Sequence, residues 1–167
     1  MDVKLFHLIN LLSGRHLIID KLMILISKKM KFVFFIILVI LLFKKRNVTI
    51  EAVVSIMISL FLHFIIKLFY FKPRPFFKGR IGILTPSKVD SSFPSKHTLI
   101  AFAVSTIVQF NQRILGSIML GLSFITGLSR IWLGHHYPSD IAGSAVLGSF
   151  TSAIIHKLLK GNGNEST

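Results

Sequence analysis

The sequence predicts an all-α integral membrane protein, a bundle of five to six transmembrane helices with an N-terminal interfacial helix. Hydrophobic residues make up 52% of the 167 residues and gather in long runs rich in isoleucine, leucine and phenylalanine, as in membrane-spanning helices. The formal net charge is +14 and basic residues flank the apolar runs, so anionic lipid headgroups or a phosphate-bearing substrate are expected partners. Cysteine is absent, which excludes disulfides and cysteine-ligated metal sites.

The N-terminal helices are predicted from two apolar segments. Residues 5–12 place apolar side chains on one helical face and are too few to cross a membrane, which favours an interfacial helix. Residues 22–43 form the first spanning candidate, although "KKMK" at 28–31 leaves a clean apolar run of only 12 residues. Either residues 22–27 complete the span while the lysines extend to the headgroups, or the lysines mark a turn between two helices. We expect the former.

The remaining chain alternates between apolar helices and one long irregular loop. Prolines together with Gly79 and Gly82 make residues 71–94 a basic loop. Pro138 suits the first turn of the last helix. No repeat or second domain is visible, so residues 1–167 are expected to form one domain, ending in a polar C-terminal tail. The later helices are expected at residues 48–70, 95–110, 113–132 and 138–159.

Small residues recur four positions apart in the last two helices. This spacing lets membrane helices approach closely, so we expect close packing there. The pairs are Ser117/Gly121, Ser123/Gly127, Ser144/Gly148 and Ala145/Ser149.

The order of the helices places four helix ends on one face of the membrane. The helix ending at 70, the helix beginning at 95, the helix ending near 132 and the helix beginning near 138 must share that face. All five prolines also lie between residues 73 and 138. A functional site is therefore expected on this face.

Three basic side chains arrive together there, each beside an apolar helix or the proline-rich loop. Alone, each could be a cation that reaches to the membrane interface. Together, Lys67, Arg74 and Arg130 favour a pocket for an anion with several oxygens, and three cations suit phosphate better than carboxylate.

Two histidines, a serine and an aspartate complete the candidate site. Ser95 begins a helix, where it can cap the helix and the free N–H groups can bind an oxyanion. His136 and Asp140 are four residues apart on one helical face, so the carboxylate can orient the imidazole as a nucleophile. His97 comes from another helix and can protonate a leaving oxygen. The pattern indicates phosphoryl transfer through a phosphohistidine.

A metal site is the alternative interpretation of these histidines. His97, His135, His136 and Asp140 carry zinc-ligand chemistry. Metal-dependent phosphoryl transfer usually gathers several carboxylates, and of the six acids only Asp90 and Asp140 reach this face. We therefore expect no metal and no other cofactor.

The other histidines receive simpler interpretations. We expect His135 to contact the interface or headgroups. His63 and His156 lie on apolar helices and are expected to be structural and away from the site.

The three blocks together resemble the type 2 phosphatidic acid phosphatase superfamily, whose signature is K-x6-R-P, P-S-G-H and S-R-x5-H-x3-D. The resemblance covers a catalytic core at about residues 48–159. Lys96 stands where the second motif usually has glycine, so the backbone there is expected to be held differently, and its ammonium could contact a second phosphate. The matching segments are Lys67 to Pro75, Pro94 to His97, and Ser129 to Asp140.

This resemblance implies a role for each matching residue. It implies that His136 is the nucleophile, that Asp140 orients it, that His97 protonates the leaving group, and that no metal is required. It also implies that the phosphate is held by Lys67, Arg74, Ser95 and Arg130.

The wording "SFPSKHT" and "SRIWLGHHYPSD" is similar to the bacitracin-resistance branch of undecaprenyl-diphosphate phosphatases. That branch implies hydrolysis of a lipid diphosphate in cell-wall synthesis, in a bacterial cell membrane, with the site facing the extracytoplasmic side. Six basic residues would then lie inside, as the positive-inside rule favours, but the basic loop at 71–94 would lie outside. The six are Lys44, Lys45, Arg46, Arg113, Lys157 and Lys160.

Three other functions remain open at this point. Phosphatidate and phosphatidylglycerophosphate phosphatases have a similar pattern of motifs, so either activity is possible for this chain. A transport or resistance component would bind a lipid or peptide without catalysis. A basic anchor for nucleic acid explains the charge but not the spacing of the three blocks, so nucleic acid is not an expected partner.

Overall fold

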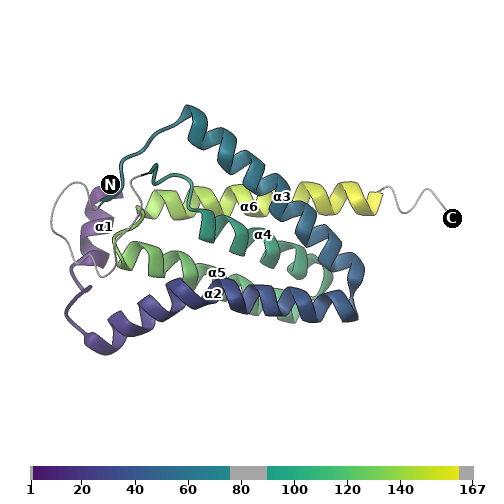
Figure 1. Ribbon diagram of the computed structural model, residues 1–167, viewed down its shortest axis with the longest axis horizontal. Helices are drawn as coiled ribbons and strands as arrows, with labels where there is room; N and C mark the ends of the chain where they lie inside the picture. The colour runs from purple at the N-terminus through teal and green to yellow at the C-terminus, as the bar shows by residue number, and fades with distance from the viewer. Residues whose placement is uncertain (1, 76–89, 162–167) are drawn as a thin grey trace.

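The computed structural model describes residues 2–75 and 90–161, and these residues are almost entirely helical (Figure 1). The loop features Gly79, Gly82 and Pro86 and the tail beyond residue 161 lie outside the described residues. The helices are α1 (Asp2–Asn10), α2 (Leu17–Lys44), α3 (Arg46–Phe69), α4 (Lys96–Asn111), α5 (Arg113–Trp132) and α6 (Pro138–Gly161).

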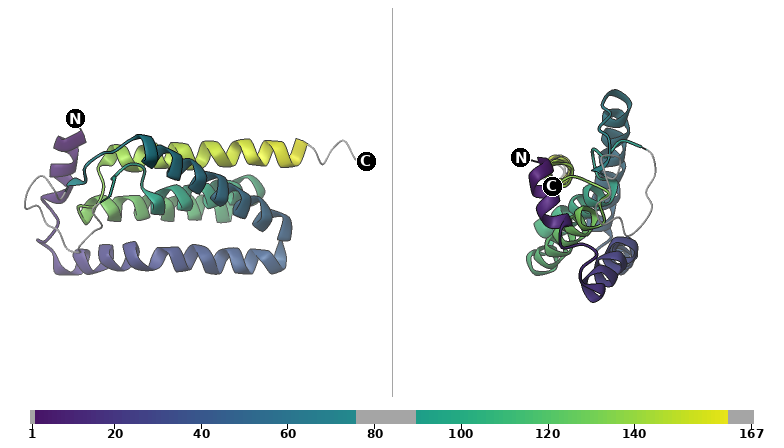
Figure 2. Two further views of the ribbon diagram at one scale, coloured as in Figure 1. Left: turned by 45° about the horizontal axis from the view of Figure 1, so that its top comes forward. Right: turned by 90° about the vertical axis from the view of Figure 1, so that its left-hand side faces the viewer.

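Five helices run along the length of the bundle and α1 lies across one end (Figures 1 and 2). Helix α4 contacts α2, α3, α5 and α6, and nine of its sixteen residues are buried, so it forms the centre of the bundle. The carboxyl ends of α3 and α5 and the amino ends of α4 and α6 meet at the end covered by α1. The expectation that these four ends share a face is confirmed.

Helix α2 is continuous through the lysine cluster, from Leu17 to Lys44. Lys28, Lys29 and Lys31 are exposed, while Phe34 and Leu41 lie in the core. The expectation of one continuous helix through the lysines is confirmed. Its buried positions recur every seven residues on both sides of the lysines, so one face of α2 packs against the bundle; they are Asp20, Ser27, Phe34 and Leu41.

The outer surface of the bundle is apolar and suits lipid. Only 17% of the apolar 18-residue stretch of α3 is buried inside the bundle, so without a membrane most of this apolar surface would face water. Among the described residues, three helices are long and apolar enough to cross: α3, α5 and α6. Helices α2 and α4 are not in this group. Helix α2 carries four lysines between Ser27 and its end, and α4 has only sixteen residues.

Close helix packing occurs at glycine, as expected for two of the predicted pairs. A Cβ on Gly148 would lie 2.5 Å from the carbonyl oxygen of Leu99, and one on Gly127 would lie 2.5 Å from Ile141 Cγ2. The Ser117/Gly121 pair is different: no atom lies within 4 Å of a Cβ built on Gly121. The close contact of this region is at Gly116, which packs on the backbone of Gln109.

Hydroxyl groups link the helices where they approach. Ser105 Oγ and Ser123 Oγ are 2.8 Å apart between α4 and α5, and the Thr106 hydroxyl donates to Ser149 Oγ at 3.0 Å between α4 and α6. In an apolar surrounding such hydrogen bonds stabilise helix association. They join α4 to α5 and to α6 in the middle of the bundle.

Helix α1 and the first turn of α2 hold the end of α5 and the residues after it. The ring of Phe6 packs edge-on against Tyr137, with 5.5 Å between the ring centroids. The Asn10 side-chain amide donates to the Trp132 carbonyl at 3.0 Å, and the Trp132 indole N–H donates to the buried Asp20 carboxylate at 2.8 Å. The N-terminal helix therefore braces the segment that carries His136.

Candidate active site

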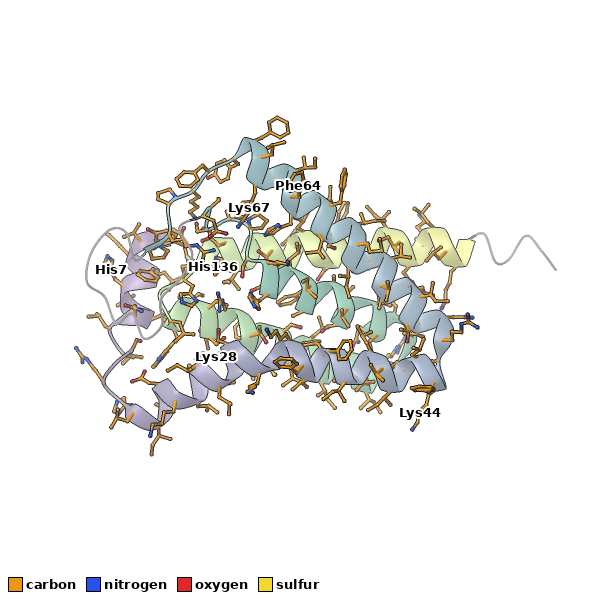
Figure 3. All side chains as sticks on the ribbon, in the orientation of Figure 1. His7, Lys28, Lys44, Phe64, Lys67 and His136 are labelled. Atoms are coloured by element: carbon orange, nitrogen blue, oxygen red, sulfur yellow. The ribbon has the colours of Figure 1, made fainter. Side chains whose placement is uncertain are left out.

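A cavity of about 530 Å³ opens at the end of the bundle where the four helix ends meet. Its walls come from α2, α3, α4, α5 and the two loop segments, so residues far apart in sequence face one space (Figure 3). Six of the eight residues predicted for the site line it: Lys67, Arg74, Lys96, His97, Arg130 and His136. Asp140 and Ser95 do not line it; both are fully buried behind its wall.

Asp90 joins two of the predicted phosphate-binding cations. Its carboxylate accepts from Lys67 Nζ at 2.8 Å, and from Arg74 Nε at 2.9 Å and Nη2 at 2.5 Å. Burial by itself raises the pKa of Asp90, but the hydrogen bond from Lys67 and the charge of Arg74 outweigh it and hold this pKa below its usual value. Lys67 and Arg74 are therefore held side by side around one anionic group.

Arg130 is placed by α2. Its Nη1 donates to Ser27 Oγ at 2.6 Å, and Ser27 is buried against the cavity. Arg74 is likewise fixed, since its Nη1 donates to the His135 carbonyl at 3.2 Å. Both guanidinium groups thus line the cavity in set positions, as bidentate recognition of phosphate oxygens requires.

His136 lies in the short connection between α5 and α6 and is 3% exposed. Its Nδ1 lies 2.6 Å from the carbonyl oxygen of Ser92. Because a carbonyl can only accept, Nδ1 carries the proton and Nε2 keeps its lone pair. The imidazole is therefore in the tautomer that a nucleophile needs.

Asp140 does not make the hydrogen bond that sequence reasoning expected. Its Oδ2 lies 3.9 Å from His136 Nδ1, which is too long for a hydrogen bond. The reason is that Oδ2 instead accepts from the backbone N–H of Tyr137 at 2.8 Å, at the start of α6. Asp140 thus holds the backbone next to His136, while Ser92 orients the ring.

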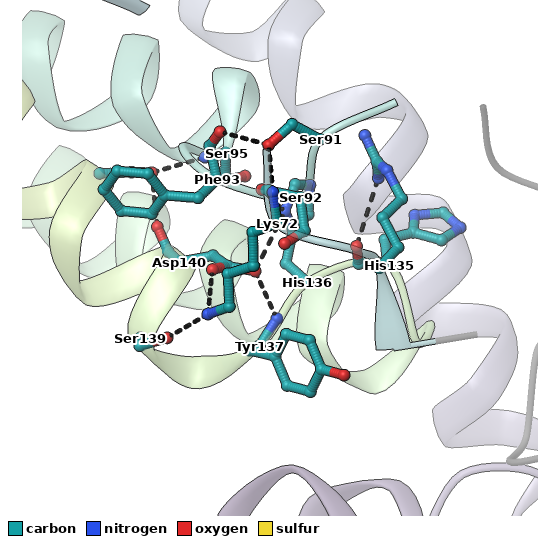
Figure 4. A network of polar contacts seen from close by, with 12 residues as sticks. Lys72, Ser91, Ser92, Phe93, Ser95, His135, His136, Tyr137, Ser139 and Asp140 are labelled. Atoms are coloured by element: carbon teal, nitrogen blue, oxygen red, sulfur yellow. Dashed lines mark hydrogen bonds and ion pairs between the residues drawn. The ribbon is translucent and has the colours of Figure 1, made fainter. Parts of the chain in front are cut away.

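The buried Asp140 carboxylate is balanced by a cation outside the predicted set (Figure 4). Lys72 Nζ donates to Asp140 Oδ1 at 2.7 Å, to Ser139 Oγ at 2.7 Å and to Asp2 Oδ2 at 3.0 Å. The Asp2 carboxylate also accepts from the Ser139 backbone N–H at 3.0 Å. A network from α1 through the loop to α6 therefore fixes the residues after His136.

Ser95 and Lys96 begin α4. The Ser95 side chain makes no capping hydrogen bond, and its backbone N–H donates to Ser144 Oγ at 2.7 Å. Ser95 Oγ accepts from the Thr98 hydroxyl at 3.1 Å. No described residue other than glycine has a positive φ, so Lys96 fits in place of glycine because it is an ordinary first residue of the helix.

His63 corrects the sequence interpretation, because it lines the cavity instead of lying away from it. It is four residues before Lys67 on α3, so the two side chains share a face. His135 also lines the cavity. His156 is structural as expected, with Nδ1 2.9 Å from Glu51 Oε2 at the other end of the bundle.

Two residues of α2, Ser27 and Lys28, belong to the cavity although no motif included them. The lysine cluster "KKMK" at 28–31 could have indicated this contribution of α2, but the sequence analysis assigned these lysines to the membrane interface. Within the described ranges, no group of three or more histidine or acidic side chains is arranged to hold a metal ion.

The electrostatics of the cavity act on His136. Burial, followed by the charges of Arg130 and Arg74, lowers the pKa of His136 well below the usual value. The imidazole is therefore neutral at neutral pH. A buried neutral histidine beside fixed cations can attack a phosphorus atom whose oxygens those cations hold.

The profile of the PAP2 superfamily matches residues 48–163 of the chain. The chain belongs to the PAP2 superfamily. It is 36% identical over 151 residues to "Undecaprenyl-diphosphatase BcrC" of Bacillus subtilis, covering 88% of this chain and 78% of that relative. It is 32% identical over 113 residues to "Bacitracin transport permease protein BcrC" of Bacillus licheniformis, covering 67% and 56%.

A solved structure has the same arrangement of helices. The crystal structure of Aquifex aeolicus LpxE superposes with a TM-score of 0.84 at 27% sequence identity, covering 93% of this chain and 94% of that one. The matched PAP2 region contains α4, α5 and α6 and nearly all of α3. The cavity of this membrane protein therefore lies at the end of the helices that the family shares.

Proposed function

We propose that the protein is a lipid diphosphate phosphatase that hydrolyses undecaprenyl diphosphate to undecaprenyl phosphate and inorganic phosphate. The observation that carries the proposal is the buried His136, with Nδ1 on a carbonyl and Nε2 free to attack, in a cavity lined by five cationic side chains. The similarity to an undecaprenyl-diphosphatase over 88% of the chain supports this substrate. Residues 1–167 act as one domain with its catalytic core at about 48–159.

In the proposed reaction, His136 Nε2 attacks the terminal phosphorus. The bond from that phosphorus to the bridging oxygen breaks, and His97, which enters the step as the imidazolium, gives its proton to the leaving oxygen and becomes neutral. Water, deprotonated by His97, then attacks the phosphohistidine and releases inorganic phosphate. His136 and His97 thereby return to their starting protonation states.

The cations have distinct tasks in this reaction. Lys67 and Arg74 exchange the Asp90 carboxylate for phosphate oxygens, because a phosphate carries more charge than one carboxylate. Arg130, fixed on Ser27, stabilises the charge that develops on the equatorial oxygens. Ser95 and Asp140 act as positioning residues from behind the wall.

The site faces the extracytoplasmic side of a bacterial cell membrane in this proposal. Lys44, Arg46 and Arg113 lie at helix ends far from the cavity, as the positive-inside rule favours. Lys72 and Arg74, which the rule would disfavour outside, are each paired with a carboxylate. Lys78, Arg80 and Lys88 lie outside the described residues.

The second candidate is a non-catalytic transport or resistance component, which the name of the Bacillus licheniformis relative favours. A monophosphate lipid phosphatase is the alternative within the same chemistry. Both differ from the proposal in what the purified protein does to undecaprenyl diphosphate.

The test is phosphate release by purified protein from undecaprenyl diphosphate, phosphatidate and phosphatidylglycerophosphate, with and without EDTA. We expect the highest kcat/KM on the diphosphate, no effect of EDTA, and loss of release in His136→Ala. His156→Ala, at the other end of the bundle, is the matched control and should retain release. A His136→Ala protein with full activity, or a wild-type protein that prefers phosphatidate, contradicts the proposal.

A further inference from the structure

A second cavity of about 400 Å³ adjoins the catalytic cavity on the side of α2. Four residues line both cavities, namely Ser27, Lys28, His97 and Arg130, but His136 lines only the first. The second cavity therefore begins where the proposed proton donor stands and extends away from the nucleophile. Its α2 wall consists of Ser27, Lys28, Lys29, Lys31 and Phe32.

An apolar pocket of about 80 Å³ follows, between α2, α4 and α5. It shares Ser27, Lys31 and His97 with the second cavity, and its other walls are mostly apolar. These walls continue from the lysines toward the middle of α2, which is the direction of the membrane core. They include Met30, Phe34, Ile100 and Ala101.

The order of the three spaces matches the order of groups in a lipid diphosphate. His136 attacks the terminal phosphorus and His97 protonates the bridging oxygen, so the phosphate that stays on the lipid must lie beyond His97. We infer that Lys28 and Lys31 of α2 bind this lipid-linked phosphate, and that the apolar pocket receives the first part of the chain. The inference rests on the proposed function and adds the residues that select a diphosphate.

Position on the helix selects these two lysines. Lys28 lines the catalytic and the second cavity, and Lys31 lines the second cavity and the apolar pocket, so they stand at its two ends. They are three residues apart and share a face of α2. Figure 3 shows Lys28 on α2 and Lys67 on α3 on opposite sides of His136.

The charges agree with this assignment. Five cations line the catalytic cavity against a single carboxylate, Asp90. Lys67 and Arg74 already contact that carboxylate, whereas neither Lys28 nor Lys31 is within 4.0 Å of a carboxylate in the part of the chain that the structure describes. The Lys31 ammonium lies 4.9 Å from the centroid of the Phe32 ring, and both residues line the second cavity. Positive charge is thus available to a second anionic group.

The two reaction products separate the two sites experimentally. Inorganic phosphate occupies the catalytic cavity, and undecaprenyl phosphate occupies the second cavity and the apolar pocket. Their inhibition constants against undecaprenyl diphosphate hydrolysis are measured for the wild type and for Lys28→Gln/Lys31→Gln. We expect the constant for undecaprenyl phosphate to rise about tenfold or more in the variant, and that for inorganic phosphate to change by less than about twofold.

Three further variants sharpen the comparison. Lys28→Arg/Lys31→Arg should restore inhibition by undecaprenyl phosphate, which shows that charge matters and that the helix is intact. Lys44→Gln, at the other end of α2, should change neither constant. Lys96 lines the catalytic cavity and not the second one, so Lys96→Gly should weaken inhibition by inorganic phosphate instead; weaker inhibition by undecaprenyl phosphate would place Lys96 on the second phosphate, as the sequence suggested.

Each outcome is decisive. If both constants rise by the same factor, the lysines act only as general surface charge and the inference is overturned. If neither constant changes, the lipid-linked phosphate lies elsewhere. A wild-type protein that releases no phosphate from undecaprenyl diphosphate refutes the proposed function itself, and the inference falls with it.

Discussion

Lys72 offers a sharp test of how the segment around His136 is held. Its ammonium is the cation that contacts the carboxylate of Asp140, which is 0% exposed. Replacing Lys72 by methionine keeps most of the side-chain volume and removes the charge. A buried carboxylate then loses its partner, while the Tyr137 N–H still needs it as acceptor.

The size of the effect follows from these contacts. Removing one partner of a buried ion pair costs about 3–5 kcal/mol. The Lys72 side chain is 22% exposed, so water compensates part of the loss and we expect about 3 kcal/mol. For a chain of this length that free energy lowers Tm by about 6–12 °C.

The measurement is thermal unfolding in detergent followed by the fluorescence of Trp132, which is the single tryptophan and lies beside this network. Asp2→Asn is the matched control. Asp2 contacts the same lysine but its side chain is 31% exposed, so its loss should lower the unfolding free energy by about 1 kcal/mol.

A double variant decides between charge and packing. Lys72→Met/Asp140→Asn removes the buried charge together with its partner, so it should be more stable than Lys72→Met alone. Two results would contradict this role of Lys72. One is that the changes in unfolding free energy of the two single variants add up in the double variant. The other is that Lys72→Met unfolds at the wild-type temperature.

Two further predictions concern packing and pH. Gly148→Ala should lower the unfolding free energy by about 1–3 kcal/mol, because its Cβ would lie 2.5 Å from the Leu99 carbonyl oxygen. Gly121 has open space around it, so Gly121→Ala should be neutral or stabilising in the same melting assay. The lowered pKa of His136 keeps the imidazole neutral as the pH falls, so the acid limb of kcat/KM, corrected for titration of the substrate, should lie below pH of about 6.5. A limb at or above that pH would contradict the burial of His136.

Helix order and motif spacing predicted most of the cavity. Lys67, His97, Arg130 and His136 meet because each stands at a helix end or in a short connection, and the order of spans brings those ends together. Such information is local in sequence, so it can be used without a structure. The continuity of α2 was predictable for the same reason, since apolar segments flank the lysines on both sides.

The hydrogen-bond partners were less accessible to sequence reasoning. The acceptor for His136 is a backbone carbonyl, that of Ser92, and a carbonyl has no side-chain signature. Asp90 contacts Lys67 and Arg74 across the loop, a pairing that depends on the loop path. His63 differs from these, because its spacing of four from Lys67 already placed it on the same face.

Lys28 and Lys31 show why charge near a membrane is ambiguous in sequence. A lysine beside an apolar run can extend to the headgroups or line a cavity, and both require the same pattern. Only the packing of α2 against α4 and α5 shows that these lysines border cavities shared with His97.

The central claim is that a phosphoryl group is transferred to His136. The direct measurement is rapid quenching of the protein with substrate labelled in the terminal phosphate, followed by mapping of the labelled peptide. We expect an acid-labile, base-stable label on His136 that is lost in His136→Ala and kept in His135→Ala. A label on His135, or turnover without any labelled histidine, would contradict it.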